Sequence, residues 1–390
     1  MATYRFGNAH GENLTVASGD ITNNVITFGN GNGDYVLAEG GNIRLDTITF
    51  GQGHDDRVLS PYGDISGDVI VFGNNSSDAT VRAGSLDKAG AISGDTIIFG
   101  DGTHNKVIDN QGGGGISNDK IVFGTGSSNI VDASSIVGTD ITFNDHRGTG
   151  HNSVIVHDRV SNSTVDFGGG NNDNFEGDTV SNSKIIFGDG NNDNLHGPSV
   201  VPLFGQTMLS NDTIQFGNGN GDSVSGYASG GNNTIILGNG NNDVIALNVR
   251  AGLGGDYLAT GIGSGDVIAV SNHTHADTFA FATFSSSLQF SSTLSGTKIY
   301  GAQSNDKIEV NGGDLGDTLV SKGTLPAGTT LSSFINSVVG DPAKGHTYIG
   351  TNGTNTFIET DTQNGHLGAI EIVGTFAHST ISNHVLTLLA

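Results

Sequence analysis

ITFGNGNGDYV, residues 26–36, sets an alternating run of glycine and asparagine between two short stretches of β type. A phosphate-binding loop after a strand needs GxxxxGK[ST], or GxGxxG at the start of a helix. No lysine follows these glycines, and Asp34-Tyr35-Val36 begins another stretch of β type. The stretch therefore predicts a reversal of the chain between two strands.

The same pattern recurs along the chain at intervals of about 22 residues. An aromatic residue anchors each unit, with leucine in the last one, and glycine follows every anchor except Phe143: Phe6, Phe28, Phe50, Phe72, Phe99, Phe123, Phe143, Phe167, Phe187, Phe216 and Leu237. From the second unit on, the residue two positions earlier is always β-branched, as Ile26 is before Phe28. Aspartate usually stands six positions after the anchor, and an apolar residue eight positions after it. The unit at Phe143 departs from the pattern after its first strand.

This spacing predicts one coil of two short strands and two turns per unit. Side chains alternate along a strand, so the anchor and the residue two positions before it point into a common core. We expect the glycines to supply positive φ angles at the reversal. Stacked coils then pair as parallel strands. The sequence predicts an all-β fold, a right-handed parallel β-roll or β-helix solenoid of coils of about 22 residues.

The rhythm loosens after about residue 250, which predicts repeats over residues 1–250 and a capping region over residues 251–390. Residues 275–290 alternate in aromatic side chains and are typical of strands. The segment 325–341 carries the pattern of a short helix, with Leu331, Phe334, Ile335 and Val338 on one side. Residues 344–376 predict a final pair of hairpins.

Composition limits the possible partners. The formal net charge is −24, with 39 acidic against 15 basic residues, which argues against nucleic acid or an anionic membrane and favours cations or a solvated surface. The chain has no cysteine, a weak indication of an extracellular protein without disulfides. The first residues have neither the basic nor the apolar segment of a secretory leader, and we find no apolar run long enough to span a membrane.

FGDGNNDNL (187–195), FGGGNNDNF (167–175) and LGNGNNDVI (237–245) resemble the glycine-rich nonapeptides of RTX, or haemolysin-type, calcium-binding proteins. The resemblance covers about residues 4–250 and implies Ca²⁺ held between successive turns. It implies as ligands the aspartates Asp34, Asp56, Asp78, Asp173, Asp193, Asp222 and Asp243. The turn is one residue longer than the nonapeptide consensus. The C-terminal part is similar to that of RTX and bacterial surface-layer proteins, which implies export by a type I exporter through the last residues, VLTLLA.

Two interpretations of the aspartates stay open. Carboxylates and carbonyls in a polar turn suit Ca²⁺, whereas Asn and Asp side chains also form ladders and turns without metal. A second set, four positions before the anchors, comprises Asp46, Asp68, Asp95, Asp119 and Asp212. For this set, turn capping is favoured over metal ligation.

We expect a secreted, extracellular structural protein, stabilised by calcium and assembling with copies of itself as a surface-layer, matrix or fibre subunit on a bacterial cell or in its surroundings. The first coil, starting by Tyr4, is expected to dock onto a neighbouring molecule. An adhesin or glycan-binding solenoid, with cell-surface polysaccharide as partner, is the alternative. A polysaccharide-modifying enzyme is less favoured, because the repeat accounts for the acidic residues and we find no separate catalytic pattern.

Overall fold

The computed structural model describes residues 1–85, 87–109, 114–146, 150–197, 207–249, 254–261, 265–270, 273, 275–281, 297–310, 315, 318–338, 345–361 and 367–389. The chain forms two compact units, Met1–Thr207 and Met208–Ala390, which we describe separately. Both contain parallel β-solenoid coils, about 12 turns of ~23 residues in all. The predicted all-β solenoid is therefore confirmed.

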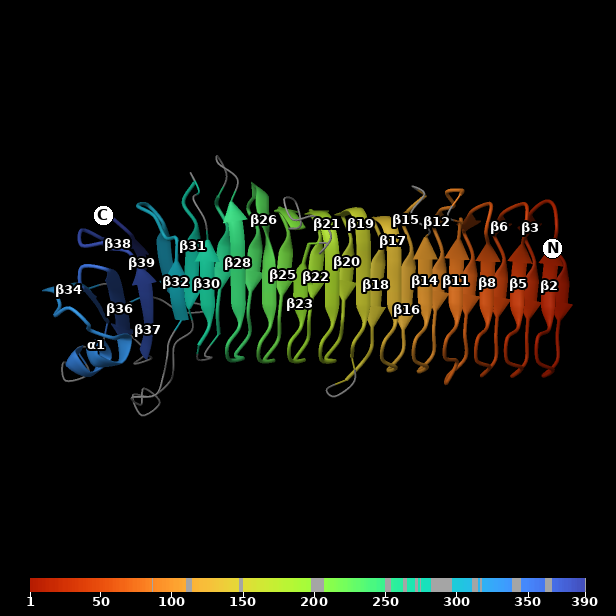
Figure 1. The fold of residues 1–390 in the computed structure, drawn as a ribbon, viewed down its shortest axis with the longest axis horizontal. Helices are drawn as coiled ribbons and strands as arrows, with labels where there is room; N and C mark the ends of the chain where they lie inside the picture. The colour runs from red at the N-terminus through yellow and green to blue at the C-terminus, as the bar shows by residue number, and fades with distance from the viewer. Residues whose placement is uncertain are drawn as a thin grey trace. The chain divides into compact units, whose positions relative to one another are not determined.

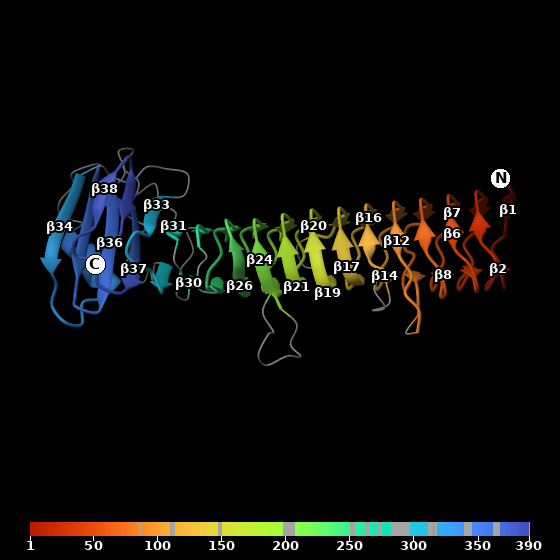
Figure 2. The ribbon, with the colours of Figure 1, turned by 90° about the horizontal axis from the view of Figure 1, so that it is seen from above.

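In the first unit, two stacks of parallel strands run side by side (Figures 1 and 2). The first stack contains the strands that precede the anchors: β1 (Thr3–Arg5), β4 (Val25–Thr27), β7 (Thr47–Thr49), β10 (Val69–Val71), β13 (Thr96–Ile98), β16 (Lys120–Phe123), β18 (Asp140–Phe143), β20 (Thr164–Asp166) and β22 (Lys184–Ile186). The second contains β2 (Asn13–Val16), β5 (Tyr35–Ala38), β8 (Arg57–Ser60), β11 (Thr80–Ala83), β14 (Lys106–Asp109), β17 (Ile130–Val137), β19 (Ser153–Ser161), β21 (Asn174–Ser181) and β23 (Asn194–His196). Equivalent residues pair in register, as Ile26 does with Ile48.

Each early coil also has a short third strand, which the sequence analysis did not predict. These strands are β3 (Ile21–Thr22), β6 (Ile43–Arg44), β9 (Ile65–Ser66), β12 (Ile92–Ser93) and β15 (Ile116–Ser117). Their isoleucines are buried. In later coils the same positions belong to the ends of β17, β19 and β21, where Ile136, Val160 and Val180 are buried. The signal in the sequence is an apolar residue seven positions before the anchor.

The core of this unit follows the predicted periodicity. Ile26, Phe28 and Val36 are buried, as are their equivalents in the following coils. The anchor rings from Phe6 to Phe187 form one continuous stack, with centroids 4.5 Å apart at Phe6–Phe28 and 5.2 Å apart at Phe143–Phe167. Stacked rings at this spacing add to the stabilisation from burial. Each coil thus contributes its own layer to a common core.

The glycines next to the anchors serve a purpose other than the expected one. The backbone N–H of Gly51 donates to the carbonyl of Gly29 in the preceding coil (2.9 Å). A Cβ on Gly51 or Gly53 would overlap the carbonyl oxygen of Gly29 or Gly31, respectively. Gly51 and Gly53 permit close contact between coils, and the prediction of positive φ angles was wrong for these two, whereas it holds for Gly168 (76°) after Phe167. Positive φ falls later in the turn, as at Gly33 (70°).

The coils of the second unit contain β24 (Thr207–Ser210), β25 (Thr213–Gln215), β26 (Ser223–Gly231), β27 (Thr234–Ile236), β28 (Val244–Val249), β29 (Tyr257–Ala259), β30 (Val267–Val270), β31 (Thr278–Phe281), β32 (Thr297–Tyr300) and β33 (Lys307–Val310). Strands of successive coils pair in parallel up to β31 with β33, and two further parallel pairs, β32 with β37 (Leu367–Val373) and β34 (Thr318–Thr324) with β35 (His346–Thr351), involve strands nearer the C-terminal end. Parallel pairing of coils therefore extends beyond residue 250, where the repeat becomes hard to recognise. The division at residues 250 and 251 stays a prediction. Of the expected strands over residues 275–290, β31 is seen, and residues 282–290 lie outside the described part.

The end of the second unit contains β34 (Thr318–Thr324), α1 (Leu331–Val338), β35 (His346–Thr351), β36 (Asn355–Asp361), β37 (Leu367–Val373), β38 (Thr380–Ser382) and β39 (Val385–Thr387). β35, β36 and β37 pair antiparallel, as the predicted hairpins require. Helix α1 buries the four expected residues against Tyr348 and Phe357. β39 pairs antiparallel with β33, and its Leu386 is buried. The apolar C-terminal residues thus form part of the fold.

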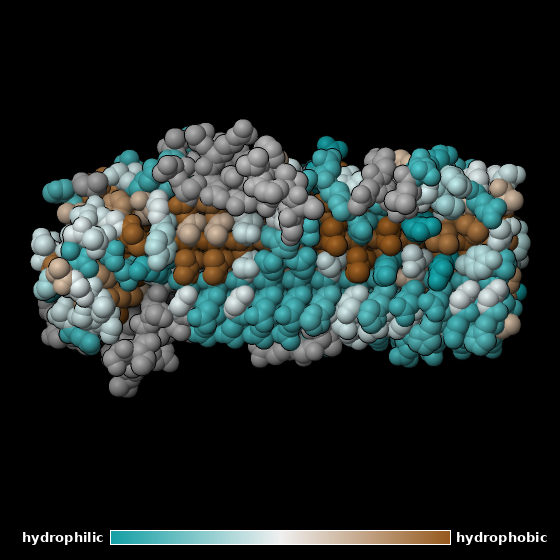
Figure 3. Space-filling model, viewed as in Figure 1, coloured by the Kyte–Doolittle hydropathy of each residue, from teal (hydrophilic) through white to brown (hydrophobic). Residues whose placement is uncertain are grey.

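Within the described residues, no helix has the length and apolar character needed to cross a membrane. On the first unit, polar surface follows the turns between the two stacks (Figure 3). Apolar side chains also point outward from the strands. Val69 of β10 and Ile98 of β13 are 41% and 36% exposed.

The close contact between coils predicts that substitutions at two glycines, in the turns of adjacent coils, change the free energy of unfolding by very different amounts. Gly53→Ala should lower the free energy of unfolding by about 3 kcal/mol, because its Cβ meets a backbone oxygen that cannot move without separating the coils. Gly33→Asn, at a position with positive φ and open space, should cost about 1 kcal/mol or less. Urea unfolding followed by circular dichroism measures both. Equal effects of the two substitutions would contradict this account.

Candidate functional site

A ladder of side-chain oxygens links the coils where the second stack begins; we call it the corner ladder. The backbone N–H of Glu12 donates to Oδ1 of Asp34 (2.9 Å), and that of Asp34 to Oδ1 of Asp56 (3.0 Å). The members in the first unit are Asp34, Asp56, Asn105, Asn129, Asn152, Asp173 and Asp193, and those in the second unit are Asp222, Asp243 and Asp266. All are buried.

The residue before each member has a left-handed backbone. It is Gly33 (φ 70°) before Asp34, Asp55 (62°) before Asp56, and Asn172 and Asn192 (both 58°) in later coils. Glycine, asparagine and aspartate tolerate this conformation best. The NND triplet of the sequence therefore holds one residue for the left-handed bend and one for the ladder.

Six of the seven predicted calcium ligands belong to this ladder, and Asp78 does not. Asp78 is exposed and has φ 59°, so it takes the left-handed position. The next residue, Ala79, is buried at the ladder position and donates its N–H to Oδ1 of Asn105 (3.0 Å). The turn after Phe72 is one residue longer than its neighbours, which shifts the register. Counting from the anchor placed Asp78 wrongly for this reason.

Asparagine and aspartate at the ladder position differ in what their second side-chain atom meets. Nδ2 of Asn105 donates to the carbonyl of Gly102 (3.0 Å), and Nδ2 of Asn129 donates to that of Gly126 (2.8 Å). In Asp34 and Asp56 the equivalent atom is Oδ2, which is buried and has no hydrogen-bond partner. A Cβ built on Gly31 would lie 2.8 Å from Oδ2 of Asp34, so this oxygen faces the equivalent glycine of its own turn. A buried carboxylate oxygen without a hydrogen-bond donor is costly, and binding a proton or a cation removes that cost.

The electrostatics agree with this arrangement. Burial raises the pKa of Asp56 to about 7, although the hydrogen bond from the N–H of Asp34 lowers it. Burial likewise raises the pKa of Asp173 to about 9, and the charge of Asp145 adds to the shift. The pKa values of Asp34 and Asp243 are raised for the same first reason, burial. These carboxylates are costly to keep charged without a counter-ion.

The side-chain oxygens of the corner ladder are suited to bind calcium in some coils and not in others. Asp34 and Asp56 lie on adjacent coils, as do Asp243 and Asp266, and all four have a buried Oδ2 without a hydrogen-bond partner. Turn carbonyls beside them supply the further oxygens that Ca²⁺ prefers. The series is interrupted by Asn105, Asn129 and Asn152. The Nδ2 of each of these amides already donates a hydrogen bond to a neighbouring oxygen, so no cation is needed there. No group of three or more His, Asp or Glu side chains is arranged for a metal within the described residues, so backbone oxygens would have to complete any site.

A second ladder lies before the first stack and contains the second set of aspartates. The N–H of Asp46 donates to Oδ1 of Asp68 (2.6 Å), and that of Asp68 donates to Oδ1 of Asp95 (2.6 Å). Oδ2 of Asp95 also accepts the N–H of Ser93 (3.1 Å), within its own turn. These bonds agree with the expected capping role. In the second unit the ladder runs through Asp212, Asn233, Asp256, Asp277 and Asp306.

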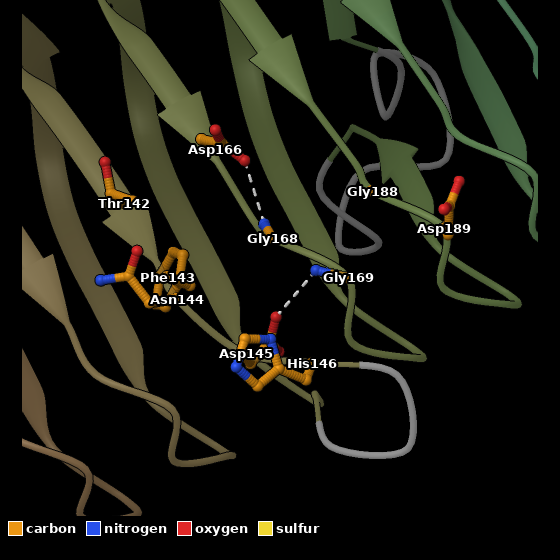
Figure 4. Close-up of a pocket in the computed structure, with 10 residues that line it drawn as sticks. All are labelled: Thr142, Phe143, Asn144, Asp145, His146, Asp166, Gly168, Gly169, Gly188 and Asp189. Carbon is orange, nitrogen blue, oxygen red and sulfur yellow. Dashed lines mark hydrogen bonds between the residues drawn. The ribbon is translucent and has the colours of Figure 1, made fainter.

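The coil at Phe143, where the repeat breaks, carries an open notch of about 540 Å³ (Figure 4). Oδ1 of Asp145 accepts the N–H groups of Gly169 (3.1 Å) and Gly170 (3.0 Å), and Oδ2 accepts Nδ2 of Asn152 (2.7 Å). Asp166 and Asp189 also line the notch. Asp145 does not belong to the repeat pattern of the sequence and was not predicted as a site residue. The broken repeat was the only signal of it.

His273 was also missed, because the histidines are scattered in the sequence. It is buried in the second unit, with Nε2 2.9 Å from Oδ1 of Asp306 and Nδ1 3.6 Å from Oδ2 of Asp277. It therefore provides a basic group inside the second ladder of that unit.

Fold and ladders together define a parallel β-solenoid protein whose coils are coupled by buried Asp and Asn side chains. No protein-family model matches the chain, and neither does any curated protein. Among solved structures it is similar to the receptor-binding domain of the siphovirus 9NA tailspike, at 10% identity over 95% of this chain and 93% of that one, with a TM-score of 0.25. A likeness this distant carries no argument about function.

The comparison of Asn and Asp coils predicts the effect of a single atom. In chelator at neutral pH, Asp56→Asn should raise the free energy of unfolding by about 1 kcal/mol, because the amide keeps the Oδ1 acceptor and gains a donor toward the turn carbonyl. Asp56→Ala should lower it by about 1–2 kcal/mol through loss of the ladder bond.

Asp78→Asn is the matched control for this pair. It should change stability by less than about 0.5 kcal/mol, since the side chain is exposed and outside the ladder. Urea titrations of the three variants give these values. A destabilising Asp56→Asn would show that the charged carboxylate is better accommodated than the geometry indicates.

Proposed function

We propose that the chain is a secreted structural protein, stabilised by calcium, that assembles with copies of itself outside the cell as a surface-layer, matrix or fibre subunit. The observation that supports this most is the corner ladder. Buried acidic side chains recur on adjacent coils, and in the ladder they accept backbone N–H groups of the neighbouring coil. They are thus built into the architecture of the solenoid itself.

Calcium would act on the stretches where two carboxylates adjoin. Beside Asp34 and Asp56, or Asp243 and Asp266, a cation would satisfy oxygens that otherwise face the turn without a donor. A ligand that binds only the folded state stabilises it by mass action. With a formal net charge of −24, the chain also gains from any neutralisation of its acidic groups. The residues in these roles are the six ladder aspartates of the predicted set together with Asp266; Asp78 is not among them.

Self-assembly would use the outward faces of the strands. Val69 and Ile98 present apolar surface on neighbouring strands β10 and β13. Burying such residues against a second copy is favourable, and the same contact repeated between copies yields sheets or filaments. Export by a type I exporter belongs to this proposal as well, and its support is the RTX-like repeats and C-terminal residues of the sequence.

A glycan-binding solenoid is the second candidate, and the notch at Phe143 favours it. Thr142, Asn144, Asp166 and Asp189 offer hydroxyl, amide and carboxylate groups around one hollow on the first unit. Polar groups of this kind suit the hydroxyls of a sugar chain. Polysaccharide of a cell surface would then be the partner.

The structural proposal predicts assembly that depends on calcium. Sedimentation velocity should show large species in millimolar Ca²⁺ that disperse in chelator, because neutralised acidic surfaces no longer repel one another. A double variant, Asp34→Asn with Asp56→Asn, keeps the ladder acceptors and should reduce the stabilisation by calcium. Val69→Lys with Ile98→Lys should prevent assembly and leave the circular dichroism of the monomer unchanged.

Asp78→Asn serves as the control for calcium and should behave as the wild type. A monomer at every protein and calcium concentration would overturn the structural proposal. Binding of that monomer to polysaccharide, lost on Asp166→Ala with Asp189→Ala, would establish the glycan-binding alternative instead.

A further inference from the structure

Four consecutive coils of the second ladder carry an aspartate, and we call Asp46, Asp68, Asp95 and Asp119 the acid column. Each backbone N–H from Asp46 to Asp95 donates to Oδ1 of the next member, at 2.6 Å in every case. The strands beside the column pair in register, so the carboxyl groups follow one another at about 4.8 Å, the spacing of neighbouring strands.

The column is almost fully removed from solvent. Its members are 2%, 1%, 2% and 4% exposed, in chain order. Oδ2 of Asp46 and of Asp119 is buried without a hydrogen-bond partner. A charged carboxylate in such a place needs a compensating charge, and otherwise it takes up a proton.

The surroundings of the column supply no positive charge. The neighbouring ladder positions are the neutral Asn24 and Thr139. Arg44, two residues before Asp46, extends to the half-buried Asp64 (3.7 Å). Lys120, next to Asp119, is exposed. Across the described ranges, no ion pair joins a column carboxyl to a basic side chain.

In the second unit, the buried carboxyl groups of the second ladder have a basic side chain beside them. There the ladder residues Asp277 and Asp306 face His273, whose Nε2 lies 2.9 Å from Oδ1 of Asp306. The charge of His273 lowers the pKa of Asp277, although burial, the larger effect, leaves it raised to about 6. The acid column has the same backbone bonds and no histidine.

We propose that Asp46, Asp68, Asp95 and Asp119 are held as neutral carboxylic acids in the folded protein, so that the first unit takes up protons when it folds and loses stability as the pH rises. The column is thus a proton-binding site built into the solenoid. It is separate from the corner ladder, and its proton uptake does not depend on the proposed calcium binding.

The direction of the pH effect follows from the pKa values. Burial, the largest cause, raises the pKa to about 8 for Asp68 and to about 7 for Asp95 and Asp119. The ordinary value in the unfolded chain is 3.8. A group that binds its proton more tightly when folded stabilises fully below the unfolded pKa, and this stabilisation is lost as the pH rises toward 7 or 8.

The test measures the unfolding equilibrium of the full chain in chelator from pH 5 to pH 8. The unfolding constant measured for the transition that includes the first unit should rise by more than about a thousandfold over this range, since each proton released per unfolding event gives a factor of about ten per pH unit. Asp119→Asn keeps the Oδ1 acceptor for the N–H of Asp95 and removes one titrating group. Its rise should be smaller by about a hundredfold, because the pKa of Asp119 is about 7 and this group contributes a factor of about ten per pH unit between pH 5 and pH 7.

Asp140→Asn is the matched control, because it removes the same charge from an exposed position on the next coil. It should keep the full pH dependence of the wild type. The infrared spectrum of the wild type at pH 6 gives an independent reading that needs no variant: the carbonyl band of protonated carboxyl groups should be present and should weaken in Asp119→Asn. An unfolding constant independent of pH, or absence of that band, would overturn the proposal. The proposal would also be overturned if calcium, and not protons, neutralised the acid column. In that case the infrared band of the wild type would disappear on adding Ca²⁺, and Asp119→Asn would no longer be stabilised by Ca²⁺.

Discussion

The structure depends on one contact repeated from coil to coil: a backbone N–H at a corner donates to the side-chain oxygen of an Asp or Asn on the following coil. Asp34 and Asp56 show it at one corner, and Asp46 and Asp68 show it at the other. Because a buried N–H without an acceptor is costly, these side chains allow the chain to turn within the stack. The glycines complete the contact by letting the backbones approach.

An acceptor that must be buried brings a charge problem when it is aspartate. Two solutions are seen in the structure and two are proposed. Asn105 and Asn129 replace the carboxylate by an amide that finds a carbonyl acceptor. His273 places a basic ring beside the ladder in the second unit. For the remaining aspartates we propose calcium at the corner ladder and protons in the acid column. Which cation or proton the protein binds at each place thus depends on what neutralises or hydrogen-bonds the buried carboxylate there.

Much of this could be predicted from the sequence. The period of Ile26, Phe28 and Val36 defined the coil and its core, because strand alternation leaves little freedom in which side chains point inward. The helix at Leu331 followed from its apolar spacing. The short third strands escaped prediction, since two residues such as Ile21–Thr22 carry too little pattern of their own.

Site residues were harder to place, because the sequence does not show which turn contains an extra residue. One insertion after Phe72 moved Asp78 out of the ladder and put Ala79 into it. Asp145 and His273 stand outside the repeat, and only the folded chain brings them to Gly169 and Asp306. The roles of the glycines were also hidden, since a clash with the preceding coil is a property of the stack.

The most direct test is a crystal structure of the full chain grown in calcium, with the ions located by their anomalous scattering. The account predicts ions at the corner ladder beside Asp34 and Asp56 and beside Asp243 and Asp266. It predicts none beside Asn105 and Asn129 and none along the acid column. Ions distributed along the acid column, or a corner ladder empty at saturating calcium, would contradict it.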